Sequence, residues 1–232
     1  MSIVGFDTAT DDVAVALTRD ADAIAERQLA PPDGGRPRHA SGLIAEIEAV
    51  VGEGGGWELV EAIGVGVGPG SFTGLRIGVA TGRALAQALA KPLVPVGTLE
   101  ALARGIGERS EASERLRLAV LDARRGQAFA ALFGPGGEQV WAPLVAGPEE
   151  LAERLRSLAR PCLAGGSGAL RFRRVLEAAG VAVLADPDPA HRVSARQVCD
   201  LAAAGASAPI ESVRPIYLRP PDAEIWLERD AR

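Results

Sequence analysis

One order of secondary-structure elements occurs twice along this chain of 232 residues, and the repetition limits the folds that it can adopt. In the first half, three short strand-like runs separated by polar turns are followed by alternating helices and strands. The expected strands are 3–7, 13–17, 24–29, 62–67 and 93–96, and the helices are 39–51, 75–89 and a short one capped by Thr98. The same order then returns, with strands at 116–121, 128–133, 139–145, 161–164 and 181–184 and helices at 148–158, 170–179 and 194–206.

This order predicts an α/β fold with two similar lobes, each a mixed β-sheet flanked by helices. We expect an N-terminal lobe at residues 1–104 and a C-terminal lobe at 115–190. Residues 191–232 are expected to form a C-terminal helix and an extended, proline-containing tail that pack back on the N-terminal lobe. At the start of that helix, Ser194 and Gln197 have the spacing of a capping box.

Composition favours a soluble, cytoplasmic protein with a packed core. Hydrophobic residues make up 47% of the chain, no apolar run is long enough to span a bilayer, and the N-terminus lacks a signal-peptide pattern. A net charge of -5 argues against strong unaided binding to nucleic acid. The two cysteines, Cys162 and Cys199, lie in apolar stretches and are expected to be buried free thiols, and a local basic cluster, Arg171, Arg173 and Arg174, is interpreted as a solvated helix face.

A glycine-rich turn at 64–78 joins a buried strand to a helix, which is the geometry of a ligand cradle. Backbone N–H groups at a helix N-terminus attract anions, and glycines at 68, 70 and 74 would let a phosphate or another backbone come close. The turn has no lysine of the P-loop type and no complete dinucleotide-binding pattern, so it does not by itself identify a phosphate site.

The helix after this turn carries small residues at every fourth position, and these share one face: Gly74, Gly78, Gly82, Ala86 and Ala90. Interior glycines cost a helix about 1 kcal/mol each relative to alanine, so something must pack closely against this face. Spacing alone leaves two interpretations open. The face packs either on the chain's own sheet or on another subunit.

Four sequence runs resemble the TsaB (YeaZ) family, whose members are accessory subunits of bacterial tRNA threonylcarbamoyladenosine modification. These runs are FDTAT at 6–10, GVGPGSFTGLRIG at 66–78, LDARRG at 121–126 and PIYLR at 215–219. The resemblance extends from the first strand to the tail and implies an actin-like (ASKHA, ribonuclease H-like) fold. It also implies a paralogue, TsaD, the catalytic subunit that modifies N6 of adenosine 37 in tRNAs reading codons that begin with A.

In TsaD a pair of histidines four residues apart on the first helix binds a metal ion, because residues at i and i+4 face the same side. Here His39 opens the matching helix, but Leu43 occupies the second position and His191 is distant in sequence. We therefore expect no metal site and no catalytic residues, and we interpret His39 as a surface or capping residue. A metallopeptidase of the glycoprotease type, a third class of function, has little chemical basis without the histidine pair.

Asp7 and Asp122 each end the first strand of a lobe, where actin-like ATPases keep carboxylates for a metal–phosphate complex. They could bind Mg²⁺ and nucleotide, or they could cap turns, and the missing phosphate-binding lysine favours the structural role. A vestigial nucleotide cleft would be built from these residues: Asp7, Thr8, Gly68, Gly70, Asp122, Gly165 and Gly166. We expect no cofactor, with ATP or ADP binding left to the complex. The alternative function is a small ATP-dependent phosphotransferase using Asp7, Asp122 and Mg²⁺.

In the resembling family, the two N-terminal-lobe helices pack against the equivalent helices of TsaD in a four-helix interface, and similar surfaces pair two copies. The residues expected to form this interface are His39, Leu43, Ile44, Ile47, Leu75, Gly78, Thr81, Gly82 and Leu85. The resemblance implies a scaffold that binds TsaD and helps recruit TsaE, forms a homodimer in isolation, and meets tRNA only through the complex, with no membrane contact.

Overall fold

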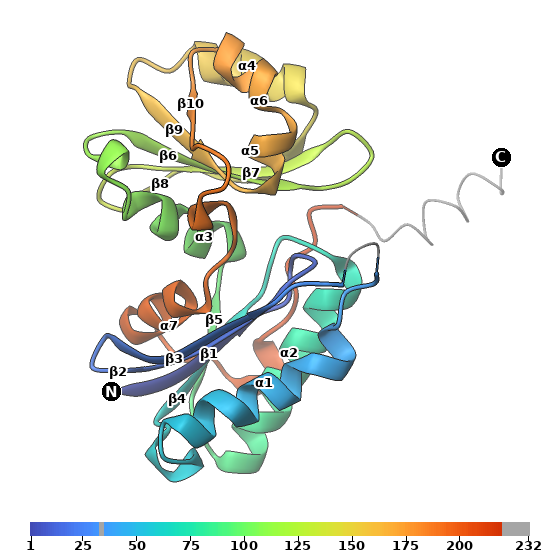
Figure 1. Ribbon diagram of the computed structural model, residues 1–232, viewed down its shortest axis with the longest axis vertical. Helices are drawn as coiled ribbons and strands as arrows, with labels where there is room; N and C mark the ends of the chain where they lie inside the picture. Colours follow the sequence, from blue (N-terminus) through green and yellow to red (C-terminus); the bar gives the residue numbers. More distant parts are fainter. Residues whose placement is uncertain (33–34, 220–232) are drawn as a thin grey trace, which may run out of the picture.

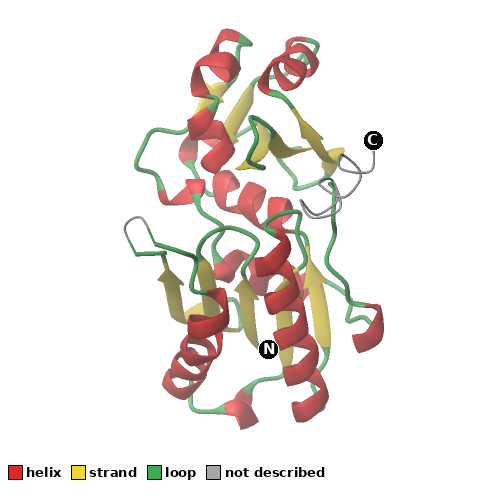
Figure 2. Ribbon diagram, turned by 90° about the vertical axis from the view of Figure 1, so that its right-hand side faces the viewer, coloured by secondary structure: helices red, strands yellow, loops and turns green. Residues whose placement is uncertain are grey.

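A computed structural model describes residues 1–32 and 35–219, and it consists of two stacked lobes (Figure 1, Figure 2). The sheet of the first lobe has the strand order β3-β2-β1-β4-β5. Its strands are β1 (Ser2–Asp7), β2 (Val13–Arg19), β3 (Asp22–Leu29), β4 (Ala62–Gly66) and β5 (Leu93–Val96). The first three strands pair antiparallel, whereas β4 and β5 run parallel to β1.

The sheet of the second lobe repeats this topology. Its order is β10-β9-β6-β7-β8, which matches the first sheet when read in the opposite direction. Its strands are β6 (Leu116–Asp122), β7 (Ala128–Phe133), β8 (Gln139–Ala146), β9 (Cys162–Gly165) and β10 (Ala182–Val183). Two mixed sheets with equivalent strand orders confirm the repetition that was predicted from the sequence.

Helices cover both faces of the first sheet and join the lobes (Figure 1). On one face, α1 (His39–Glu53) and α2 (Phe72–Leu89) pack side by side, and α7 (Ala195–Ala204) packs on the other. Between the lobes lies α3 (Thr98–Gly107), and the second sheet carries α4 (Pro148–Arg156), α5 (Ser167–Arg171) and α6 (Arg173–Ala178). Short 3₁₀ helices are η1 (Trp57–Leu59), η2 (Ser110–Ala112), η3 (Pro189–His191) and η4 (Ile210–Ser212).

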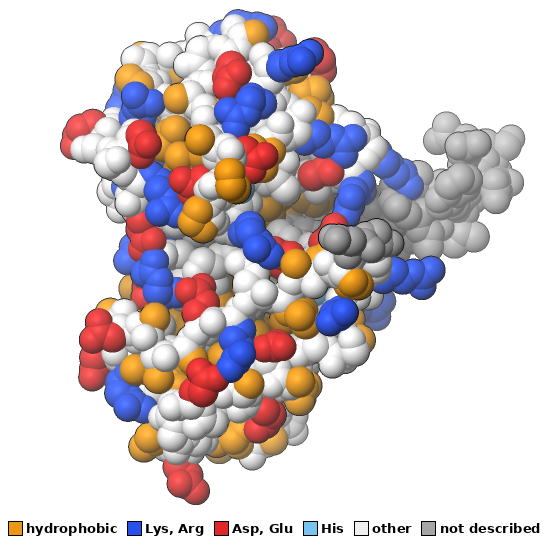
Figure 3. Space-filling model, in the orientation of Figure 1, with side chains coloured by type: hydrophobic (Ala, Val, Ile, Leu, Met, Phe, Trp, Pro, Cys, Tyr) orange, Lys and Arg blue, Asp and Glu red, His pale blue; other side chains and the backbone are white. Residues whose placement is uncertain are grey.

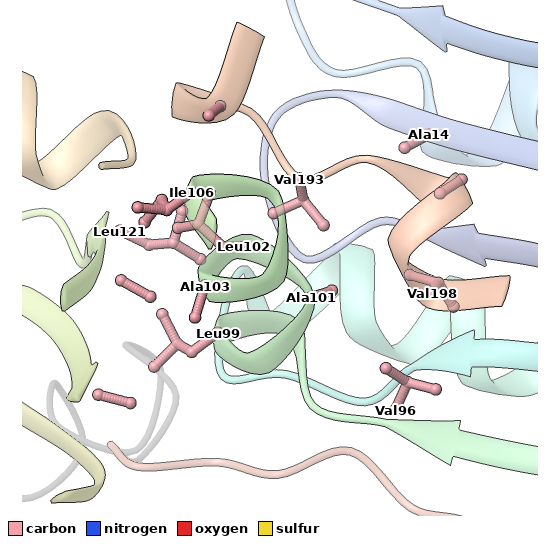
Figure 4. Packing of buried hydrophobic residues seen from close by; sticks show 14 of the residues in the cluster. Ala14, Val96, Leu99, Ala101, Leu102, Ala103, Ile106, Leu121, Val193 and Val198 are labelled. Carbon is pink, nitrogen blue, oxygen red and sulfur yellow. The ribbon is translucent and has the colours of Figure 1, made fainter. Parts of the chain in front are cut away.

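One hydrophobic cluster is shared by the two lobes and is centred on α3 (Figure 4). It combines residues of the first sheet, such as Ile3, with Leu99 and Ile106 of α3 and with Leu121 and Phe129 of the second sheet. A second cluster lies between the first sheet and α1 and α2, and a third fills the second lobe. Because α3 contributes to the shared cluster from the middle, it acts as the joint between the lobes.

The small face of α2 packs on its own chain. A Cβ atom at Gly74 would overlap the Thr8 carbonyl oxygen, and one at Gly78 would overlap the Thr8 hydroxyl. At Gly82 a Cβ atom would lie 3.3 Å from Cβ of Val65. Of the two interpretations left open by the spacing, internal packing is therefore the one that the structure contains.

This packing corrects the predicted partner-facing residues. Leu43 and Leu75 have exposed fractions of 1% and 0%, and Ile47 is also fully buried. His39, Gly78 and Gly82 are buried as well, so these six residues face the chain's own interior rather than a partner. Ile44, Thr81 and Leu85 are at least partly exposed. The i, i+4 spacing identified an apolar stripe correctly, but the stripe contacts the first sheet.

The predicted cap at Thr98 is wrong, and so is the predicted capping box of Ser194 and Gln197, although Ser194 does occupy the N-cap position. Thr98 is the first residue of α3, but Gly97 occupies the N-cap position and no side chain caps the helix. Ser194 is the N-cap residue of α7, yet its hydroxyl bonds the carboxylate of Glu26, 2.6 Å away, while Gln197 donates to Glu108. The helix predicted at 170–179 is broken into α5 and α6 at Phe172.

Both cysteines are buried and free, as predicted, and burial raises the pKa of each thiol to about 12. The tail beyond α7 is described only in part. Ala208 bridges to Leu93 of the first sheet, whereas the portion of the predicted tail at 220–232 lies outside the described residues. No helix in the described ranges, 1–32 and 35–219, has the length and apolar character needed to cross a membrane.

The close approach at Gly74 predicts opposite effects for two glycine-to-alanine substitutions. Gly74→Ala should lower the free energy of unfolding by about 2 kcal/mol, because the strain of overpacking exceeds the gain of about 1 kcal/mol in helix propensity. Gly52→Ala in α1, where a Cβ atom meets nothing within 4 Å, should raise it by up to about 1 kcal/mol. Urea unfolding of both variants checks this, and equal shifts of the same sign would contradict the packing.

Candidate functional site

A cleft of about 750 Å³ lies between the lobes and is lined by loops from both. In Figure 3, basic and acidic side chains alternate along the boundary between the lobes. The lining includes the loop after β1, the start of α2, the β6–β7 turn and the chain near residues 191–192 and 217–219. The volume of the cleft is in the range of small-molecule sites, and its lining combines apolar residues with several charged groups.

Asp7 does not line the cleft, and it has a structural role. Its side chain is buried, accepts a hydrogen bond from the backbone N–H of Ala9 at 2.6 Å, and accepts another from the Thr98 hydroxyl at 2.7 Å. The Thr98 hydroxyl in turn accepts from the N–H of Gly68 at 3.1 Å. Burial raises the pKa of the Asp7 carboxyl, and the hydrogen bonds from Thr98 and Ala9 act in the opposite direction.

Asp122 does line the cleft, but its carboxylate is already bonded. One oxygen accepts from the guanidinium of Arg171 at 2.7 Å, and the other accepts from the backbone N–H of Arg124 at 2.9 Å. Arg171 was interpreted from the sequence as part of a solvated helix face, but its guanidinium forms an ion pair with Asp122 of the cleft. The structure does not bring Asp7 and Asp122 together at the cleft surface.

Two further carboxylates in the cleft, Asp11 and Asp12, were not identified from the sequence. Asp11 pairs with Arg124 of the second lobe, and Asp12 pairs with Arg192, whose Nε lies 2.7 Å from the carboxylate. Among the described residues, each of the three carboxylates that line the cleft thus has a guanidinium partner. Throughout residues 1–32 and 35–219, no three His, Cys, Asp or Glu side chains converge as a metal site. The signal available in the sequence was a pair of acidic residues directly before β2, in the short loop that follows β1.

The glycine-rich turn is held by contacts within the chain. Besides the N–H of Gly68, the N–H of Ser71 donates to the carbonyl of Ala9 at 2.7 Å. Ser71 caps α2, and its hydroxyl accepts from the N–H of Gly74 at 3.3 Å. Gly70 lines the cleft, but a Cβ atom there would overlap the Ala9 carbonyl. The glycines were predicted to allow close approach of a phosphate or of another backbone, and at Gly70 and Gly74 the loop after β1 is the backbone that approaches.

Thr8, predicted as a cleft residue, is fully buried, and its hydroxyl donates to the Gly74 carbonyl at 2.8 Å. Gly165 and Gly166 also lie behind the cleft lining, where Gly165 packs near Ile106 of α3. The N–H of Gly166 donates to Nδ1 of His191 at 3.1 Å. His191 itself lines the cleft, and its Nε2 lies 3.1 Å from the carbonyls of Leu184 and Ala185.

His39 is neither a surface residue nor a cap, which corrects its interpretation from the sequence. It is buried, its Nε2–H donates to the Thr10 carbonyl at 2.8 Å, and its ring packs beside Gly74. Leu43, one helical turn later, is buried in the core. The ring of His39 therefore ties α1 to the cleft loop, and the next position on its face offers no metal ligand.

Comparison with known proteins connects this geometry to one group. A family model described as TsaD, tRNA N6-adenosine threonylcarbamoyltransferase, matches residues 24–157, which is more than half of the chain. The tRNA threonylcarbamoyladenosine biosynthesis protein TsaB of Escherichia coli K12 is 29% identical over 227 residues, covering 94% of this chain and 95% of that protein.

Solved structures agree with the sequence comparison. YeaZ from Pseudomonas aeruginosa superposes with a TM-score of 0.74 at 26% identity, covering 94% of this chain and 99% of that one. A ROK hexokinase from Thermus thermophilus superposes with a TM-score of 0.52 at 16% identity over 85% of this chain and 97% of its own. This second likeness concerns the fold alone, and it confirms the predicted actin-like architecture.

The burial of Asp7 predicts a specific dependence of stability on pH. Because its pKa is raised in the folded state, Asp7 favours folding below its unfolded pKa of about 3.9, and this contribution is lost as the pH rises through the folded pKa. Relative to Asp7→Asn, which does not titrate, the wild-type chain should lose stability as the pH rises above about 4. Urea unfolding at a series of pH values measures the difference.

Thr98→Val supplies the matched variant for this experiment. It removes the hydroxyl that stabilises the charged carboxylate, so the loss of stability with rising pH should become steeper. A difference between wild type and Asp7→Asn that stays constant with pH would show that Asp7 is not perturbed by burial.

Proposed function

We propose a function from one premise: this chain belongs to the TsaD family and, within it, to the TsaB (YeaZ) branch. It acts as a non-catalytic scaffold subunit required for N6-threonylcarbamoyladenosine modification at position 37 of tRNAs reading ANN codons. In this role it binds and stabilises TsaD and helps to recruit TsaE. We expect it in the cytoplasm, with no cofactor of its own and with ATP or ADP bound only at the level of the complex.

The main support for a non-catalytic role is the identity of the residue one helical turn after His39. A metal site of the TsaD type needs a second ligand at i+4, and that position is Leu43, buried in the core of the chain. The paired carboxylates of the cleft support the same conclusion. A cation that entered the cleft would have to displace the guanidinium groups of Arg171, Arg124 or Arg192 from their carboxylates.

The outward face of α1 and α2 is the surface we propose for TsaD. Ile44 is half exposed on this face, and most of the other exposed residues of α1 and α2 are small, which allows helices to approach closely. The exposed residues of this face, which we call the outer face, are Ala40, Ser41, Ile44, Ala45 and Glu48 of α1 and Thr73, Arg76, Ala80, Ala84, Gln87 and Ala88 of α2. Two helices of this length can supply the roughly 800 Å² per partner of a standard interface.

The same outer face would pair two copies of the chain in isolation, so homodimer and TsaD complex would compete for it. The net charge of -5 supports contact with tRNA through the complex rather than through this subunit alone. The domain division predicted from the sequence, 1–104, 115–190 and 191–232, remains part of this proposal, with partner binding assigned to the first lobe.

Substitutions on the outer face should weaken TsaD binding without unfolding the chain. Ala84→Arg places a long charged side chain within the proposed helix–helix contact and should weaken binding at least about tenfold, or 1.4 kcal/mol. The matched control is Ala178→Arg, an exposed alanine on α6 of the other lobe, which should bind normally. Calorimetric titration into purified TsaD provides the measurement.

A reconstitution with TsaD, TsaE, tRNA and a supply of threonylcarbamoyl-adenylate extends the same test to activity. Modification should require this chain and should decrease with Ala84→Arg but not with Ala178→Arg. Full modification without the chain, or equal binding by both variants, would contradict the proposal.

ATP hydrolysis distinguishes the scaffold from the alternative, an ATP-dependent phosphotransferase. The scaffold proposal predicts no hydrolysis by the isolated chain. The isolated chain should not hydrolyse ATP with Mg²⁺ above the buffer rate, because Asp7 is buried away from the cleft and Asp122 is bonded to Arg171. Sustained turnover that is lost in Asp122→Asn would revive the enzyme. Asp122 suits this test better than Asp7, whose removal would also disturb folding.

A further inference from the structure

A short segment near the C-terminal end of the described chain lines the cleft and connects the two lobes. We call residues 215–219 the strap. The backbone N–H of Ile216 donates to the carbonyl of Val67 in the first lobe at 2.7 Å. Three residues later, Nη1 of Arg219 donates to the side chain of Gln127 in the second lobe at 3.2 Å. Leu218 packs against the hydrophobic cluster that both lobes share.

Tyr217 adds an aromatic contact between the strap and the first lobe. Its ring centroid lies 5.0 Å from that of Phe72 at the start of α2, and the guanidinium of Arg76 lies 5.1 Å above the Phe72 ring. Contacts of this kind are worth more than the area that they bury alone. The strap also forms part of the cleft wall, since Tyr217, Leu218 and Arg219 all line it.

A second connection across the cleft comes from the β6–β7 turn. Arg124, Arg125 and Gly126 have φ values of +63°, +52° and +74°, a left-handed run that is unfavourable for the two arginines. Strained backbone of this kind persists where its surroundings hold it and often marks a functional position. Here the turn directs Arg124 across the cleft to an ion pair with Asp11 of the first lobe.

Asp11, Arg124 and residues 217–219 line the cleft, whereas the cluster centred on α3 joins the lobes through buried side chains. In Figure 1 α3 lies between the lobes, and the red segment that follows α7 passes from the first lobe toward the second on the right of α3. The ion pair is largely exposed and is weak by itself, so this connection between the lobes depends on the strap and the ion pair together.

We propose that the strap and the Arg124–Asp11 pair form a clamp that fixes the separation of the lobes, so that the chain's own residues, rather than a bound ligand, hold the cleft at the width seen in this structure. Release of the clamp would let the second lobe rotate about the α3 joint and open the cleft. This inference does not require the proposed function, because it concerns only the isolated chain.

Spin labels at Glu58→Cys on η1 and Glu153→Cys on α4, both exposed and in different lobes, report the lobe separation. The native cysteines are buried with pKa values raised to about 12, so they should remain unlabelled in the folded chain. Pulsed electron–electron double resonance on the labelled parent should give one narrow distance distribution, unchanged by added Mg²⁺ and ATP.

Arg124→Gln combined with Tyr217→Ala should broaden this distribution and shift it to longer distances. Reversing the pair, with Asp11→Arg and Arg124→Asp, should keep the narrow distribution. The control is Arg154→Ala, which removes an exposed ion pair to Glu150 within α4 and should change nothing. Circular dichroism verifies that each variant is folded, and the single variant Arg124→Gln, altered only at an exposed side chain, should show a smaller broadening if the double variant unfolds.

Two results would overturn the clamp. One is an unchanged distance distribution in the folded double variant that combines Arg124→Gln with Tyr217→Ala. The other is a broad distribution in the parent that narrows only with Mg²⁺ and ATP, which would assign closure to a ligand. Neither result bears on TsaD binding, so failure of the clamp and failure of the proposed function can be distinguished.

Discussion

The contact between α2 and the loop after β1 is the one on which the rest of the molecule depends. Because Gly74 has no side chain, the carbonyl of Thr8 approaches its backbone closely, and the Thr8 hydroxyl donates to the Gly74 carbonyl at 2.8 Å. His39 packs beside the same glycine and donates to Thr10. The interior glycines cost α2 about 1 kcal/mol each in helix propensity, and this packing offsets the cost. The helices that carry the outer face are thereby fixed to the loop that forms the cleft.

The order of elements and the two equivalent sheets could be predicted because hydrophobic periodicity is local information. Which face of each helix contacts the chain's own sheet, and which is free for a partner, could not be predicted. Leu43 and Ile47 have the same spacing whether they contact the chain's own sheet or another subunit, and only burial distinguishes these cases. The predicted caps at Thr98 and Ser194 failed because both hydroxyls are used by distant carboxylates, Asp7 and Glu26.

The candidate site shows the same division between local and long-range information. Side chains alternate along β1, so Val4 and Phe6 face α1 and α2 while Ile3 faces α3 and α7, and Asp7 shares the side of Ile3. The alternation could therefore have predicted that Asp7 points toward α3. By contrast, the ion pairs of Arg124 with Asp11 and of Arg192 with Asp12 join residues 113 and 180 positions apart. Only the assembled topology brings those residues together.

The glycine-rich turn explains how a phosphate-binding geometry can serve packing instead. An anion at a helix N-terminus is held by backbone N–H groups that have no other partner. In this chain the N–H groups of Gly68, Ser71 and Gly74 donate to the Thr98 hydroxyl, the Ala9 carbonyl and the Ser71 hydroxyl. A phosphate could use these three N–H groups only by breaking the bonds that they already make. The turn thus stabilises the position of α2, and the surface of that helix, rather than the turn itself, is where we look for function.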